Sequence, residues 1–162
     1  MKIWIDISNA PHVNFFKDFI DEWKEKYEVV VTTRHLSNTI DLLDQHNIEY
    51  DIVGSHYGKN KFAKIMGFFK RCNELHNYLK QRNIDIAISQ SSFYSPYVAN
   101  KLKIPSIYTN DNEFAKGNYI GFLLASDVLL PEALKEWAKG RFFENKVSFY
   151  PGVKEGIYIK KN

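Results

Sequence analysis

The stretch KIWIDISNAPHVNFF, residues 2–16, decides the fold. Its first six residues are a short and mostly apolar run, typical of a strand that is buried on both faces. Pro11 then suits the first position of a helix, where its missing backbone N–H costs nothing. Beyond it, apolar residues recur at helical spacing at Phe16, Phe19, Ile20 and Trp23. A strand that runs directly into a helix predicts the first half of a β-α-β unit.

The same alternation continues along the chain, without an internal repeat or a low-complexity segment. The expected strands are residues 2–7, 28–33, 49–53, 84–89, 106–109, 128–130 and 147–150. The expected helices follow the first, second and third strands, then cover residues from 92 to before 104, 118–124 and 131–139. This pattern predicts an α/β protein with a Rossmann-like, doubly wound and mostly parallel sheet of six to seven strands. The expected strand order is 3-2-1-4-5-6, with helices on both faces.

Composition limits the class of protein. The 162 residues, 44% hydrophobic and 25% charged, indicate a soluble globular domain. A net charge of +3 is too small to indicate a nucleic-acid partner. The single cysteine, Cys72, excludes an internal disulfide and a cysteine metal cluster. No signal peptide is evident, and the longest apolar run is far shorter than the roughly 20 residues that cross a bilayer. We therefore expect a cytoplasmic protein.

The predicted strand order places a ligand crevice between the first and fourth strands, at their carboxyl ends. SNAPH, residues 8–12, forms its first wall. Because a helix N-terminus disfavours positive charge, His12 is expected to be neutral and able to act as a general base, or else to cap the helix and bond to Asn9. Asn9 either binds a ligand hydroxyl or holds the turn. Asp6, inside the strand, is expected to be a structural partner of a backbone or basic group.

The second wall is SQSSFYS, residues 89–95. Ser89, Gln90, Ser91 and Ser92 could together hold a phosphate, while Ser91 or Ser92 is also a natural helix N-cap. The chain has neither a G-x-G-x-x-G motif nor a P-loop, so a standard dinucleotide or nucleoside-triphosphate site is not expected. We expect no cofactor.

Two further loops add candidate residues. In TNDNEF, residues 109–114, Asp111 and Glu113 could bind sugar hydroxyls or a cation, or simply favour a helix start. No metal is expected, because only these two carboxylates are close in sequence. In GSHYGKNK, residues 54–61, Lys59 could close over an anionic group, unless the loop is only a solvated connection. The basic helix after it is either a solvated outer helix or a membrane-surface face with Phe68 exposed.

Three stretches carry a family resemblance: residues 2–17, the DNE at 111–113, and YPGVKEGIYI at 150–159. They resemble an uncharacterised prokaryotic family that is similar to the two-domain GT-B glycosyltransferases and to UDP-N-acetylglucosamine 2-epimerase. The resemblance covers essentially the whole chain. It implies a Rossmann-like, acceptor-side N-terminal domain at residues 1–150. Residues 151–162 would then lead into a C-terminal domain that this chain lacks.

The resemblance also implies a function. The chain would be a glycosyltransferase-like domain that handles a sugar or a sugar nucleotide, and any transferase or epimerase-like activity would need the second domain. It supports His12 as the base. Implied partners are the sugar ligand and either a C-terminal domain or a second copy of the chain, with no nucleic acid. The alternatives are a non-catalytic ligand-binding or assembly module and, more weakly, a peripheral-membrane enzyme half acting on a lipid-linked sugar.

Overall fold

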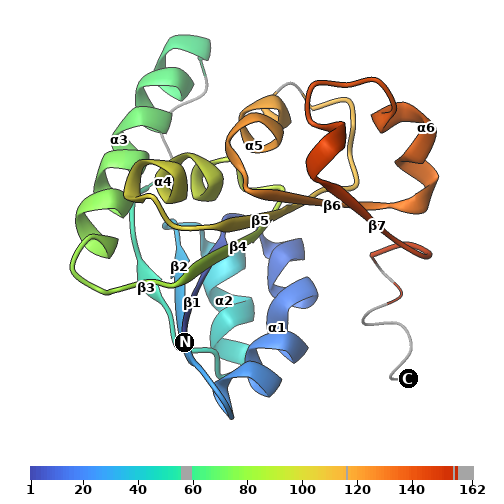
Figure 1. The fold of residues 1–162 in the computed structure, drawn as a ribbon. Coiled ribbons are helices and arrows are strands. Elements are labelled where there is room, and N and C mark those ends of the chain that lie inside the picture. The colour runs from blue at the N-terminus through green and yellow to red at the C-terminus, as the bar shows by residue number, and fades with distance from the viewer. Residues whose placement is uncertain (56–59, 116, 155, 157–162) are drawn as a thin grey trace.

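The structure is a computed structural model that describes residues 1–55, 60–115, 117–154 and 156. Within these residues one seven-stranded sheet forms, with every neighbouring pair parallel, in the order β3-β2-β1-β4-β5-β6-β7 (Figure 1). The strands are β1 Lys2–Ile7, β2 Glu28–Thr33, β3 Asp51–Ile52, β4 Ile86–Gln90, β5 Ser106–Thr109, β6 Asp127–Pro131 and β7 Val147–Tyr150. The predicted doubly wound, Rossmann-like sheet is confirmed, and the seventh strand continues the order outward.

Three strands differ from the prediction, and the smallest difference is in β6, which is one residue longer at each end. β3 has two residues instead of the five expected, because the chain before it leaves the edge of β2. There Ile48 turns into the hydrophobic core, and the Tyr50 hydroxyl donates to Asp44 Oδ1 at 2.8 Å. β4 begins later than expected and ends one residue later, at Gln90.

The helices are α1 Ala10–Lys24, α2 Ser37–Gln45, α3 Lys61–Leu79, α4 Tyr94–Leu102, α5 Asn118–Leu124 and α6 Lys135–Ala138. The expected helix at 131–139 is shorter than predicted. β6 extends to Pro131, and a 3₁₀ turn, η1 Glu132–Leu134, separates the strand from α6. A second 3₁₀ turn, η2 Glu144–Lys146, precedes β7. α4 begins at Tyr94, two residues later than expected.

β1 shows why the sheet is covered on both sides. Ile3, Ile5 and Ile7 point into a core shared with α1 and α2, while Trp4 packs into a core shared with α3 and α4. The two pairs of helices therefore lie on opposite faces of the sheet, as Figure 1 shows. A third cluster covers the far strands, with Tyr108, Phe122, Val128, Leu130 and Phe143 at its centre. Among the helices of the described residues, none has the length and apolar content to cross a membrane.

Candidate functional site

The loops that follow β1, β4 and β5 meet at the carboxyl edge of the sheet. The backbone N–H of Ser91 donates to the Thr109 carbonyl at 2.9 Å, and Asn110 Nδ2 donates to Ser91 Oγ at 3.1 Å. Ser92 Oγ joins the β4 loop to β1 by donating to Asp6 Oδ2 at 2.5 Å. The structure thus brings the three predicted loops together at one edge.

Asp6 forms the floor beneath these loops. Its side chain is fully buried and accepts hydrogen bonds from Arg71 Nη2 at 2.7 Å, Thr32 Oγ1 at 2.9 Å and Ser92 Oγ. Burial alone would raise the pKa of Asp6, but the Arg71 charge and these hydrogen bonds hold the pKa below its ordinary value. The prediction that Asp6 is a structural partner of a basic group is confirmed.

Ser89 and Ser92 lie inside the protein. Ser89 Oγ donates to the Ser92 carbonyl at 3.2 Å, and both side chains are almost completely buried. The prediction that Ser91 or Ser92 caps the next helix is wrong, since Phe93 is the N-cap residue of α4 and no side chain caps that helix. The Ser92 hydroxyl bonds to the Asp6 carboxylate instead, because an ionised acceptor makes the stronger hydrogen bond.

Gln90, Ser91 and Asp111 form a second hydrogen-bonded group nearer the surface. Gln90 Nε2 donates to Asp111 Oδ1 at 3.0 Å and to Ser91 Oγ at 3.4 Å, and Gln90 Oε1 accepts from Thr109 Oγ1. Ser91 has a φ of +51°, an unusual conformation for a residue with a side chain. Such backbone outliers cluster at binding sites, where neighbouring contacts hold them in place.

Glu113 takes no part in this hydrogen-bonded group. Glu113 is half-buried in the loop after β5, and its side chain makes no hydrogen bond or ion pair with the described part of the chain. Lys59 lies outside the described residues. Among those described, no cluster of three or more His, Cys, Asp or Glu side chains is arranged to hold a metal ion.

His12 lies at the start of α1, with only 6% of its surface exposed. Its backbone N–H donates to the Asn9 carbonyl at 3.0 Å, and its Nδ1 lies 3.5 Å from Ser8 Oγ. Its Nε2 has no hydrogen-bond partner among the described residues. Burial lowers the pKa of His12 from 6.5 to about 4, with Asp6 acting in the opposite direction and Lys154 and Arg34 adding to the decrease. The imidazole is therefore neutral at pH 7, as predicted, although burial rather than the helix N-terminus is the main cause.

Sequence reasoning missed two cations near His12. Arg34, directly after β2, donates from Nε to the Ser8 carbonyl at 2.9 Å and from Nη2 to Asn9 Oδ1 at 2.8 Å. Lys154 Nζ lies 2.5 Å from Asp111 Oδ2. Arg34 could have been found, because its strand ends beside β1 at the same edge of the sheet. Lys154 follows β7, in a stretch interpreted only as a connection, and a lone lysine carries no sequence signal.

The arrangement defines what the site can do chemically. A neutral imidazole with an unpartnered Nε2 can accept a proton from a hydroxyl group. Arg34 and Lys154 supply positive charge near it, which suits phosphate or another anion. Asn9, Ser91 and Asp111 add amide, hydroxyl and carboxylate groups that can bond to sugar hydroxyls. The described residues therefore gather, at one edge of the sheet, polar and charged groups of the kinds that bind hydroxyls and anions.

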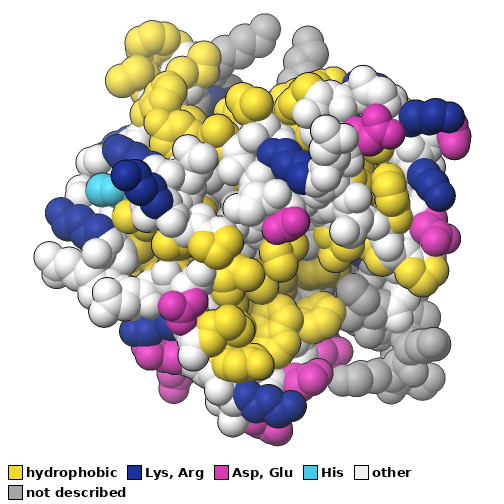
Figure 2. Space-filling view, viewed as in Figure 1, with side chains coloured by type: hydrophobic (Ala, Val, Ile, Leu, Met, Phe, Trp, Pro, Cys, Tyr) yellow, Lys and Arg dark blue, Asp and Glu magenta, His cyan; other side chains and the backbone are white. Residues whose placement is uncertain are grey.

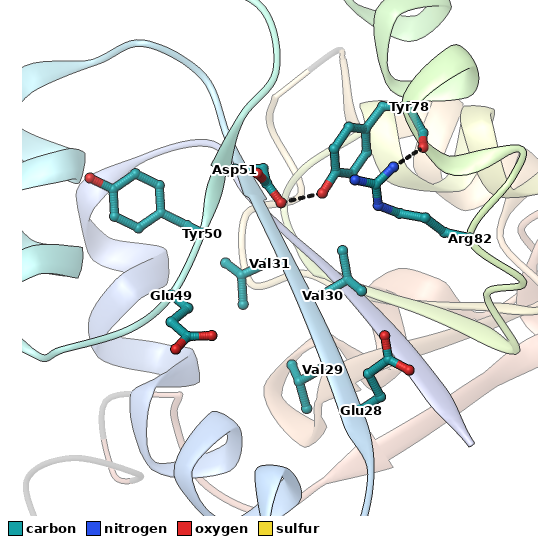
Figure 3. A pocket seen from close by; sticks show the side chains of 9 residues that line it. All are labelled: Glu28, Val29, Val30, Val31, Glu49, Tyr50, Asp51, Tyr78 and Arg82. Carbon is teal, nitrogen blue, oxygen red and sulfur yellow. Dashed lines mark hydrogen bonds between the residues drawn. The ribbon is translucent and has the colours of Figure 1, made fainter.

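A separate groove lies at the amino end of β2, where the chain before β3 is not paired with the sheet (Figure 3). Its volume is about 360 Å³, and Glu28, Val29, Val30, Val31, Glu49, Tyr50, Asp51, Tyr78 and Arg82 line it. The Tyr78 hydroxyl donates to Asp51, and the Arg82 guanidinium lies 3.6 Å above the Tyr78 ring. This groove opens beside the first residues of β2, whereas Arg34 and the crevice follow its last residue, so none of the predicted site residues lines it.

Comparison with solved structures defines the fold as that of GT-B glycosyltransferases and UDP-GlcNAc 2-epimerases. Staphylococcus aureus MnaA, solved with UDP, matches with a TM-score of 0.74 and 16% identity, over 98% of this chain and 47% of that chain. The UDP-GlcNAc 2-epimerase of Methanocaldococcus jannaschii matches with a TM-score of 0.69 and 15% identity, over 100% of this chain and 50% of that chain. MurG of Acinetobacter baumannii matches with a TM-score of 0.65 and 16% identity, over 80% and 41%.

The chain belongs to the DUF354 family, a family described as "Protein of unknown function", whose sequence model matches residues 1–162. An uncharacterised protein of Methanocaldococcus jannaschii is 32% identical over 138 residues, which are 84% of this chain and 40% of that relative. The chain therefore spans less than half the length of this curated relative. The predicted family resemblance is confirmed.

Proposed function

We propose that this chain is the acceptor-side domain of a glycosyltransferase-like or sugar-nucleotide epimerase-like enzyme, with His12 as general base. The observation that carries the proposal is a buried, neutral His12 at the carboxyl edge of the sheet, close enough to Arg34 and Lys154 for both charges to lower its pKa. A base that is uncharged at pH 7 can remove a proton from a sugar hydroxyl as that oxygen attacks. Two of the similar structures were solved with UDP and with UDP-GlcNAc, which supports a sugar nucleotide as the ligand class.

Each crevice residue has a role in this proposal. Arg34, Lys154 and the backbone N–H groups at the start of α1 would neutralise a phosphate or another anionic group. Asn9, Ser91, Gln90 and Asp111 would orient hydroxyls, and Glu113 and Lys59 would extend the site if their loops close over the ligand. Residues 1–150 would form the acceptor-side domain, with residues 151–162 leading to a second domain that completes the enzyme.

A thermal-shift titration of the 162-residue chain tests ligand binding. The probes are UDP-GlcNAc, UDP and N-acetylglucosamine, applied to the wild-type chain, to His12→Gln and to the matched control His46→Gln at the end of α2. A site filled at a hundred times its Kd adds about 2.7 kcal/mol of stability. We expect a shift in the wild type and in His46→Gln that is reduced in His12→Gln. An equal shift in all three proteins would contradict a role for His12.

The second candidate is a non-catalytic ligand-binding module. It would use the same polar groups at the carboxyl edge, since Asn9, Ser91 and Gln90 can hold a hydroxyl-bearing ligand without a chemical step. Turnover of UDP-GlcNAc by the full-length family protein separates the two functions. An enzyme should lose turnover in His12→Gln while its fold persists. A binding module should show ligand-induced shifts and no turnover in either form.

A further inference from the structure

Helix α3 carries two apolar stripes, of which one is buried in the core and the other is more than half exposed. Phe68, Cys72, Leu75 and Leu79 form the buried stripe beneath the helix. The second stripe lies on the first half of α3, where Phe62, Ile65, Met66 and Phe69 are 74, 57, 55 and 52% exposed. Spacings of three and four place these four side chains on one face over two turns. We call these four residues the α3 patch.

The α3 patch is convex. In Figure 1 the N-terminal half of α3 projects beyond α4 and the sheet, and Figure 2 shows apolar side chains gathered over this projecting end. Its base is held firmly, because the Phe69 ring lies 5.2 Å from Phe68 and 6.3 Å from Tyr97. Exposed apolar surface of this extent on a projecting element indicates a docking face rather than scattered surface residues.

The charged residues along this half of α3 are basic, and Glu74 is the first acid after them. Residues 61–73 include Lys61, Lys64, Lys70 and Arg71 but no aspartate or glutamate. Lys64 and Lys70 are exposed, whereas Arg71 is buried against Asp6. Phe68 is only 9% exposed, so the membrane-surface alternative for this helix was wrong in expecting Phe68 to be exposed. The exposed face instead combines apolar side chains with lysines, which complements an anionic surface that has an apolar interior.

We propose that the α3 patch docks the protein on an anionic lipid surface. The four apolar side chains enter the headgroup boundary, and Lys64 and Lys70 lie near the lipid phosphates. A convex face suits a deformable lipid layer, whereas a protein partner would need a matching groove. The helix lies on the membrane rather than across it, because its opposite stripe is part of the core. This inference does not depend on the proposed function of the crevice.

Vesicle co-sedimentation of the 162-residue chain tests the proposal. The probes are vesicles of phosphatidylcholine alone and of phosphatidylcholine mixed with phosphatidylglycerol, at low and high salt. We expect binding to the mixed vesicles that weakens at high salt. Ile65→Ser/Phe69→Ser should lower the partition coefficient at least tenfold. Lys64→Gln and Lys70→Gln should each lower it about fivefold, on the mixed vesicles only.

Leu123→Ser is the matched control, since Leu123 is 61% exposed on α5 and lies outside the α3 patch. It should bind as the wild type does, and melting curves verify that every variant is folded. Failure to sediment with mixed vesicles at low salt would overturn the proposal, as would equal binding by Ile65→Ser/Phe69→Ser. Light scattering provides a third outcome. If the wild-type chain is a dimer that does not bind vesicles, and Ile65→Ser/Phe69→Ser is a monomer, the patch binds a second copy of the chain. That result would overturn lipid docking.

Discussion

The Asp6 carboxylate and the Arg71 guanidinium form an ion pair, with 2.7 Å between Oδ1 and Nη2, and both side chains are completely buried. Arg71 also donates from Nε to the Val53 carbonyl at 3.1 Å and lies 4.4 Å above the Tyr94 ring. Space for it depends on Gly54, whose φ is +89° and whose Cβ, if present, would lie 2.8 Å from Arg71 Cγ. The pair therefore joins β1, the end of β3 and α3 beneath the crevice.

Removing one partner of this pair should be costly. Arg71→Met leaves the Asp6 charge buried without its counter-ion, and we expect a loss of about 3–5 kcal/mol in the free energy of unfolding. Urea denaturation measures it, with Lys64→Met on the exposed face of α3 as the control. The double variant Asp6→Asn/Arg71→Met should recover part of the loss. A cost below about 1 kcal/mol for Arg71→Met would show that the pair is not needed for stability.

The pH dependence of stability should report His12. Its pKa falls from 6.5 to about 4 on folding, so the unfolded chain binds a proton that the folded chain excludes. Above pH 6.5 His12 is neutral in both states, and its titration does not change the free energy of unfolding. As the pH drops from 6.5 toward 4, the free energy of unfolding falls by about 3 kcal/mol at most. Urea denaturation between pH 4.5 and 7.5 should show a shallower slope for His12→Gln than for the wild type. Parallel slopes would place the titrating group elsewhere.

Lys103 offers a stabilising substitution. It ends α4 in the left-handed region, with φ +60° and ψ +36°, and its side chain is exposed. Glycine adopts this conformation without steric cost, so Lys103→Gly should raise the free energy of unfolding by about 0.5–1 kcal/mol. Lys101→Gly, inside α4, is the control and should lower it by about 1 kcal/mol. Thermal denaturation compares the two, and a loss of stability in Lys103→Gly would contradict the prediction.

Gly121 permits the close approach of α5 to β5. A Cβ there would lie 2.5 Å from Tyr108 Cζ, and the Tyr108 side chain is fully buried with its hydroxyl bonded to Asn118 at 2.9 Å. Gly121→Ala should therefore lower the free energy of unfolding by about 1–3 kcal/mol through overpacking. Leu123→Ala, exposed on the same helix, should change it by no more than about 0.5 kcal/mol. If Gly121→Ala is as stable as the wild type in urea, α5 can move away from Tyr108 without cost, which would contradict the prediction.

Arg34 should separate phosphate recognition from sugar recognition in the proposed site. Arg34→Gln removes a cation beside Asn9, so the affinity for UDP-GlcNAc should fall about tenfold, as expected for the loss of a charge-assisted hydrogen bond. The affinity for N-acetylglucosamine should stay the same. Titration calorimetry with both ligands measures the difference, and Lys24→Gln at the end of α1 is the control. An equal loss of affinity for both ligands would mean that Arg34 only holds the conformation of the turn at Ser8 and Asn9 and does not bind phosphate.

Much of the fold could be predicted from local patterns. β1, β2 and α1 are recognised from the spacing of the apolar side chains that become buried. That spacing can be read from a few neighbouring residues. The two-residue β3 could not be predicted in this way, because its length depends on Ile48 and Tyr50 finding partners in α1 and α2. The start of α4 was predicted two residues too early for a similar reason, since the Ser92 hydroxyl bonds to Asp6 on β1 instead of capping the helix.

The same division applies to the site. Sequence patterns alone predicted the strand order, the loops that gather at one edge of the sheet and the candidacy of His12, because parallel strands expose their carboxyl ends at one edge. The folded structure was needed to show that Ser89 and Ser92 are held internally, that Arg34 and Lys154 lie near His12, and that Arg71 is buried while the α3 patch is exposed. Those outcomes depend on contacts between residues far apart in the chain. Burial and charge at such contacts arise only when the whole sheet and its helices have assembled.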